Sequence, residues 1–192
     1  ELLNGQTLPH ELVRESDGTF TFQQIVWEPR RAGDDDSNPE PSFVGQRIND
    51  VFFYRDRLGF LAGENVIMSR SGDYFNFWAQ TVTTLIDSDP IDIGSTARRV
   101  SNMIHAIPHD ERLLIFSADN QFTLVHGDTL TPSNVGLETT TAYQCSTISE
   151  PRSAGPNIFF SADTGQFSKV REYLVQGEAE QDDAIDVTAH CP

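Results

Sequence analysis

Three aspartates near the middle of the chain come closest to the pattern of a metal site. Asp87, Asp89 and Asp92 form a D-x-D-x-x-D string, and such carboxylates are the oxygen ligands that Ca²⁺ takes. A calcium loop also needs Gly at its sixth position and Glu at its twelfth. Here those positions hold Asp92 and, depending on the start chosen, Arg98 or Arg99. The match fails, so we expect no metal at this string.

A second group of candidate ligands lies just beyond it. His105 and His109, followed by Asp110 and Glu111, superficially resemble a zinc site. Pro108 would break the helix that could place the two histidines on one face. We therefore interpret the segment as a turn before the next apolar run. The acidic run at 34–36 is likewise expected to be a solvated loop rather than a cation site.

Patterns for covalent catalysis or glycoside hydrolysis carry little weight in this sequence. No G-x-S-x-G element occurs, and Ser69-Arg70-Ser71-Gly72 lacks the preceding glycine. A carboxylate pair such as Asp110 and Glu111 could serve as acid and base on a sugar. With 29 acidic residues in the chain, however, some pair of carboxylates will always lie at a suitable separation, so the pattern is not specific. We name no catalytic, cofactor-binding or metal-binding residue and expect a protein that is not an enzyme.

An aromatic cluster at 74–78 is the remaining candidate for ligand contact. Tyr74, Phe75, Phe77 and Trp78 could form a platform for a carbohydrate, or they could supply core or subunit-interface area. We expect the second role.

The elements that must position these residues are β-strands, because the dominant hydrophobic period is two. Residues 19–27 are predicted to form a strand whose apolar parity switches, as at a β-bulge, and 29–42 an exposed Pro- and Asp-rich loop. One short helix is predicted at 95–104, where Ser95 could cap the first turn. Further strands are predicted at 51–55, 57–62, 65–69, 113–117, 122–126, 137–145, 158–161 and 167–175.

A degenerate repeat runs through these strands. Residues 57–67, 112–122 and 156–167 each contain an apolar strand, a small-residue turn and a second strand. Their spacing brackets the period expected of propeller blades. We therefore expect a mainly β chain of propeller-like antiparallel blades, divided into an N-terminal strand segment (1–28), the loop (29–42) and a β domain of two to three blade units (43–192).

Composition narrows the possible partners. The chain has 192 residues, 29 acidic against 13 basic residues and a formal net charge of −16, and Lys169 is the single lysine. Without a basic cluster, binding of DNA or RNA by neutralising phosphates is nearly excluded. No apolar run approaches the ~20 residues of a membrane span. Cys145 and Cys191 stand in no metal spacing, so we expect two free thiols and folding in a reducing compartment.

The most distinctive part of the sequence is the stretch 50–78, which contains the string RLGFLAGENVIMSRSGDYFNF at 57–77. This stretch resembles the tail tubular protein B, or tail nozzle, family of short-tailed bacteriophages. Segments similar to those that follow in that family occur here in the same order, at 88–93, 105–108, 130–132 and 185–190. The resemblance covers about residues 41–192, while 1–40 contribute little. We interpret the chain, which starts at Glu1 and stops abruptly, as a fragment of a larger subunit.

The resemblance implies a structural role in the virion, with assembly in the host cytoplasm. Proteins of this kind form a six-fold ring with propeller-like domains around a channel for DNA ejection. The implied partners are copies of the chain itself, the tail adaptor (tail tubular protein A) and tail fibres, with transient passage of DNA and no membrane insertion. No cofactor and no site residue is implied. A tail-associated polysaccharide hydrolase and a non-catalytic sugar-binding propeller are the alternatives.

Two further expectations follow from the residues. The apolar side chains of the outermost segments, Phe20 and Phe22 at one end and Ile185 and Val187 at the other, are expected to pack against chain outside a single core or against one another. The acidity would keep a channel wall from binding DNA, although it would equally serve solubility.

Overall fold

The chain folds into four antiparallel β-sheets, three of which have four strands each. The computed structural model describes residues 3–95, 100–174 and 183–189, and no helix occurs among them. The expected mainly β fold is thus confirmed. Each four-stranded sheet pairs its strands in chain order. The first sheet consists of β3 (Ile48–Tyr54), β4 (Arg57–Ala62), β5 (Asn65–Met68) and β6 (Ile91–Gly94), and the second of β7 (Met103–His109), β8 (Arg112–Ser117), β9 (Gln121–Val125) and β10 (Gly136–Thr141). The third consists of β11 (Arg152–Ala154), β12 (Asn157–Thr164), β13 (Phe167–Leu174) and β14 (Asp183–Asp186).

The three repeat segments are the central hairpins of these sheets. They correspond to β4–β5, β8–β9 and β12–β13, with the predicted small-residue turns between the paired strands. Gly63 turns the first hairpin with a φ of +56°, a left-handed conformation that glycine adopts without steric cost. The repeat in the sequence therefore reports a real repeat of structure, and four antiparallel strands in chain order is the build of a propeller blade.

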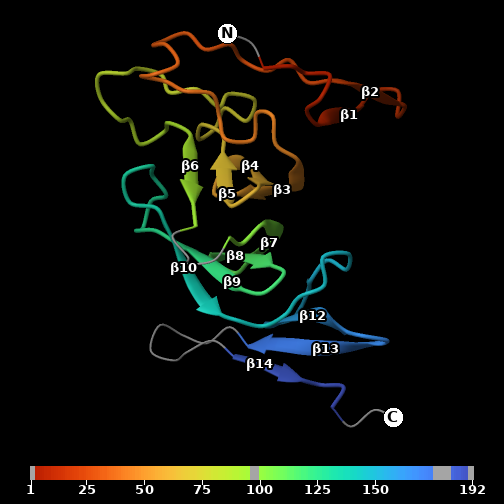
Figure 1. The fold of residues 1–192 in the computed structure, drawn as a ribbon. Helices are drawn as coiled ribbons and strands as arrows, with labels where there is room; N and C mark the ends of the chain where they lie inside the picture. Colours follow the sequence, from red (N-terminus) through yellow and green to blue (C-terminus); the bar gives the residue numbers. More distant parts are fainter. Residues whose placement is uncertain (1–2, 96–99, 175–182, 190–192) are drawn as a thin grey trace.

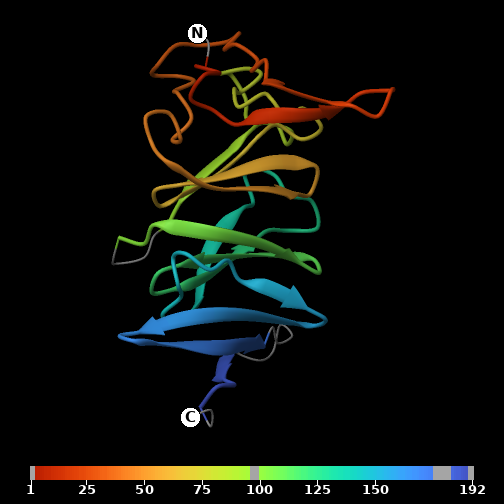
Figure 2. The same cartoon turned by 90° about the vertical axis from the view of Figure 1, so that its right-hand side faces the viewer.

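The sheets are stacked one on another, with the N-terminal segment at one end and the third sheet at the other (Figures 1 and 2). Each pair of neighbouring sheets encloses its own apolar cluster, since both faces of a middle sheet must be covered. Between the first and second sheets lie Phe52, Tyr54, Leu61, Val66, Met68, Ile91, Met103, Ala106, Leu113, Ile115, Phe122, Leu124 and Leu130. Between the second and third lie Ile107, Leu114, Phe116, Cys145, Ile158, Phe160, Tyr173 and Ala184.

A third cluster covers the outer face of the first sheet. There the N-terminal segment and the chain between β5 and β6 supply side chains that pack on Phe60, Ala62 and Ile67 of the sheet. The covering residues are Leu3, Ile25, Trp27, Phe43, Phe77 and Trp78.

The fourth sheet is a two-stranded hairpin of β1 (His10–Arg14) and β2 (Phe20–Gln24). The predicted bulged strand over 19–27 is wrong in its extent, because β2 ends at Gln24. The parity switch instead marks the point where the chain leaves the hairpin, and Ile25 and Trp27 enter the core beyond it.

The loop at 29–42 contains no strand, as predicted, but it is anchored rather than free. Asn38 is buried and its Nδ2 donates to the carbonyls of Ala32 and Ala79, at 2.9 and 3.2 Å. The guanidinium of Arg30 lies over the Trp78 ring, 5.3 Å from its centroid. The boundaries proposed at 28 and 42 stay a prediction.

The helix predicted over 95–104 is wrong wherever the chain is described. Residues 96–99 lie outside the described residues, while Met103 and Ile104 belong to β7. Val100 is 81% exposed, and the residues of β7 pair with β8 along its whole length. The histidines also lie in this strand rather than in a turn, and Pro108 is tolerated because β7 is an edge strand.

Candidate functional site

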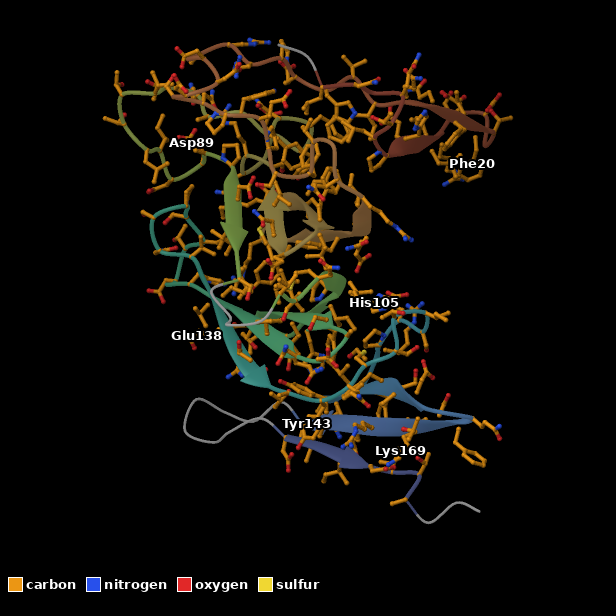
Figure 3. The ribbon with its side chains drawn as sticks, in the orientation of Figure 1. Phe20, Asp89, His105, Glu138, Tyr143 and Lys169 are labelled. Carbon is orange, nitrogen blue, oxygen red and sulfur yellow. The ribbon has the colours of Figure 1, made fainter. Side chains whose placement is uncertain are left out.

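The acidic string holds the loop between β5 and β6 in place. Asp89 is buried, and its two carboxylate oxygens accept the backbone N–H groups of Gln80 and Ile86, each at 3.0 Å. Asp92, in β6, instead anchors the end of the loop at 29–42, since its carboxylate accepts from the backbone N–H of Ser42 at 2.8 Å. Figure 3 shows Asp89 among the loops above the first sheet. These carboxylates act as backbone caps, and nowhere in the described chain do three or more His, Cys, Asp or Glu side chains gather as metal ligands would.

Arg57 completes the anchoring of this loop, and sequence reasoning missed its role. It is 1% exposed. Its Nη1 donates to the carbonyls of Ser69 and Asp89, both at 2.7 Å, and its Nη2 donates to that of Asp87 at 2.8 Å. Burial lowers the pKa of Arg57, and the nearby Asp89 opposes that shift. The signal in the sequence is an arginine at the start of an otherwise apolar strand.

The aromatic cluster at 74–78 is mostly core, as expected, and does not form a sugar platform. Phe77 stacks on Phe60 with ring centroids 5.1 Å apart, and Phe43 meets both rings edge-on. Trp78 is buried and donates from its ring N–H to the carbonyl of Glu28 at 3.0 Å.

Tyr74 is the exception within this cluster. It stays partly exposed against Phe53, and its hydroxyl donates to the Asp56 carboxylate at 2.6 Å.

The histidine segment does not assemble a zinc site. His109 is buried, with Nδ1 3.0 Å from the Ser153 hydroxyl and Nε2 3.0 Å from the carbonyl of Pro156, so it joins the second sheet to the third. Asp110 and Glu111 form the exposed β7–β8 turn and line neither groove described below.

His105 lies half-buried in β7 (Figure 3), and its Nε2 has no hydrogen-bond partner. Burial lowers the pKa of His105, and this outweighs the upward pull of the Asp50 and Glu150 carboxylates. The imidazole of His105 is therefore protonated at a lower pH in the folded chain than in the unfolded chain, where the pKa of a histidine is about 6.5.

We expect the free energy of unfolding to fall as the pH drops from 7 toward 5, because the unfolded state then binds more protons. His105→Asn should flatten this part of the profile, as measured by urea midpoints at pH 7, 6 and 5. An unchanged slope in the variant would contradict the assignment.

Polar side chains also join the third sheet to the segment that follows β10. The Tyr143 hydroxyl donates to the Asp183 carboxylate at 2.6 Å, and the Arg171 guanidinium lies 4.6 Å from the Tyr143 ring centroid. This hydrogen bond raises the pKa of Tyr143 and lowers that of Asp183.

Cys145 lies in the core between the second and third sheets, where burial raises the pKa of its thiol to about 12 and leaves it a poor nucleophile. Cys191 lies outside the described residues.

The surfaces most suited to binding are apolar. On the hairpin, Leu12, Phe20 and Phe22 are 64, 61 and 71% exposed. Figure 3 shows Phe20 on the projecting hairpin, clear of the sheets. At the other end of the stack, Ile185 and Val187 are exposed beside β13. The two sets lie at opposite ends (Figure 1) and so do not pack on one another; contact with chain outside this structure stays a prediction.

Hollows also lie among the described residues. A largely apolar groove of about 650 Å³ lies beside the base of the hairpin, lined by Leu3, Leu8, Phe43, Val44, Ile48 and Val51 among others. A smaller polar hollow of about 270 Å³ is lined by Glu28, Arg31, Arg70, Asp73 and Gln80 among others. The described residues contain no helix that is both long enough and apolar enough to cross a membrane.

Comparison with known proteins agrees with the resemblance in the sequence. Residues 1–192 match the family described as bacteriophage nozzle protein. The tail tubular protein gp12 of Escherichia phage T7 is 44% identical over 188 residues, which are 97% of this chain and 24% of that protein. The chain thus spans about a quarter of the length of this curated relative.

Proposed function

Because the chain belongs to the bacteriophage nozzle protein family, we propose that it is a structural part of the tail tube of a short-tailed phage. In this role it forms part of the wall of the channel through which DNA leaves the virion. The observation that carries the proposal is the combination of a stack of sheets joined by apolar cores with uncovered apolar surfaces at both of its ends. A tube wall needs such surfaces for subunit contacts.

The finer assignment concerns the neighbours in the tail. Copies of the subunit form a ring, six by resemblance, which contacts the adaptor protein and the tail fibres. DNA passes through without specific binding, and the excess of acidic residues supports this because a wall rich in Lys and Arg would hold DNA by counterion release.

The alternatives from other classes find no comparable support. A polysaccharide hydrolase would need two carboxylates across a concave site, whereas Asp110 and Glu111 lie on an exposed turn. The aromatic cluster considered as a sugar platform is mostly core, because Phe75, Phe77 and Trp78 pack in the cluster on the outer face of the first sheet.

A nonsense mutation in the gene tests the proposal. We expect particles with filled heads and shortened tails that fail to eject DNA, seen by electron microscopy and by a DNA-release assay. Supplying the intact protein in trans should restore both. Particles that carry complete tails and eject normally without the protein would overturn the proposal.

A further inference from the structure

The turn that leads into β1 contains the single Asn-Gly pair of the sequence, Asn4 and Gly5. The turn closes where the backbone N–H of Thr7 donates to the carbonyl of Asn4 at 3.2 Å, and Asn4 is exposed. The side-chain amide of an asparagine can be attacked by the backbone nitrogen of the next residue. Glycine leaves the most room for this attack, because it has no side chain. The pair is therefore a position at which the chain can modify itself.

The nucleophile of this reaction is the backbone nitrogen of Gly5. Within the described chain no group accepts a hydrogen bond from its N–H, so no contact is lost when the proton leaves. The carbonyl of the same peptide group, which belongs to Asn4, accepts from both the N–H and the hydroxyl of Thr7, each at 3.2 Å. These two donors withdraw electron density from the peptide group. The N–H of Gly5 is more easily deprotonated as a result.

The side-chain amide of Asn4 is arranged as the electrophile. Its Oδ1 accepts from the backbone N–H of Gln6 at 3.1 Å, and this oxygen gains negative charge when Cγ is attacked. A backbone N–H already directed at such an oxygen stabilises the charge as it develops. No group of the described chain binds the leaving nitrogen, Nδ2, so ammonia can depart directly into solvent.

Asn134 has the opposite arrangement at another exposed position. Its Nδ2 donates to the carbonyl of Thr129 at 2.7 Å, and its Oδ1 accepts from the backbone N–H of Thr131 at 3.0 Å. The next residue is Val135, whose stiff β-branched side chain obstructs closure of a ring. Asn134 is thus an internal reference for Asn4 within the same chain.

We propose that Asn4 is a site of spontaneous modification, at which the folded chain converts asparagine into isoaspartate and aspartate. The deprotonated nitrogen of Gly5 bonds to Cγ of Asn4, the Cγ–Nδ2 bond breaks, and ammonia leaves with a proton taken from water. The product is a five-membered succinimide. A water molecule then adds to one of the two ring carbonyls and opens the ring. The net reaction exchanges an amide for a carboxylic acid and involves no oxidation or reduction.

Isoaspartate is the product that changes the main chain. It forms when water attacks the main-chain carbonyl of the ring, which is the carbonyl that Thr7 polarises in the turn, so we expect it to predominate. It adds one carbon to the main chain before Gly5. Gly5 lies against the carbonyl of Ile25 and the ring of Trp27, two residues of the cluster on the outer face of the first sheet. The lengthened chain must therefore shift on that cluster.

Both products also add a negative charge to the groove of about 650 Å³. Asn4 is one of the residues that line this groove, and Arg47 is the only ionisable residue among the described residues that line it. The modification thus places a carboxylate on a largely apolar surface. The inference is independent of the proposed function, because the reaction needs no neighbouring subunit.

Peptide mapping of the purified full-length protein tests the site. Samples are aged at pH 7 and pH 8 and digested; chromatography then separates the aspartate and isoaspartate peptides, and mass spectrometry detects the exchange of NH₂ for OH. We expect progressive loss of the Asn4 amide, with isoaspartate as the main product. The loss should be faster at pH 8, because the nucleophile is the deprotonated nitrogen. The peptide that contains Asn134 should keep its amide over the same period.

Gly5→Ala is the matched variant. Its new methyl group would come no closer than 3.4 Å to the nearest surrounding atom, so the fold should tolerate it, and an unchanged urea midpoint checks this. The methyl group obstructs ring closure, so the modified peptide should be lost. An Asn4 amide that persists in the folded protein but is lost in urea would overturn the proposal, since the fold would then protect the site. Equal modification of the parent and of Gly5→Ala, or of Asn4 and Asn134, would also overturn it.

Discussion

Replacing Arg57 by methionine should lower the free energy of unfolding by about 3 to 5 kcal/mol. The guanidinium is buried and donates to three backbone carbonyls at 2.7 to 2.8 Å. Removing it leaves these acceptors without donors, at about 1 to 3 kcal/mol for each group that water cannot reach. The chain between β5 and β6 loosens as a result, so the total stays below the simple sum. Urea denaturation measures the change, with the slope checked for constancy.

A matched control uses the neighbouring arginine. Arg55 lies at the β3–β4 turn, exposed, with its guanidinium 5.9 Å from the Tyr54 ring centroid. Arg55→Met should cost no more than about 1 kcal/mol, the value of an exposed cation–π contact. Arg57→Lys should fall between the two, because an ammonium cannot span the three carbonyls as the planar fork does. Equal losses for Arg55→Met and Arg57→Met would contradict the anchoring role.

The sequence predicted the sheets well because their signals are local. The alternation of apolar residues and the turn residues at Gly63 and 118–120 define the central hairpins without knowledge of the rest of the chain. Short edge strands carry less signal: β6 has four residues and β11 three, and their pairing depends on a neighbour already in place. Both were missed for this reason.

The candidate site was harder to predict, because it depends on which face of a strand is covered. Phe20 and Ile25 look alike in the sequence, yet one is exposed on the hairpin and the other is in the core. The difference arises at Gln24, where β2 ends. The parity switch marks this point, but a bulge within a longer strand would give the same switch. The role of Arg57 likewise becomes evident only when the chain at 87–89 folds back to meet it.

The family signature becomes a set of packing requirements once the fold is known. Arg57 anchors the loop, Gly63 turns the hairpin, and Phe77 fills the outer cluster. None of these roles involves chemistry on a substrate. A signature of this kind holds the covering loop on the first sheet.

Gly59→Ala is expected to lower the free energy of unfolding by about 3 kcal/mol, although alanine normally stabilises a strand by roughly 0.5 to 1 kcal/mol relative to glycine. Gly59 lies in β4 directly opposite Phe52 in β3. A methyl group there would come closer than 3.0 Å to three atoms of the Phe52 ring. The ring lies in the cluster between the first and second sheets, so it can move away only by displacing residues of a close-packed core. Urea denaturation again measures the effect.

Two further variants separate this clash from a general effect of alanine. Gly94→Ala, in β6 of the same sheet, places its methyl no closer than 3.4 Å to Asn65 and should change stability by about 0.5 kcal/mol or less. Phe52→Leu removes the ring, so the double variant Phe52→Leu/Gly59→Ala should be nearly as stable as Phe52→Leu alone. The two changes then couple in the favourable direction, as contacting residues do. Additive losses in the double variant would show that Gly59 is needed for some reason other than room for Phe52.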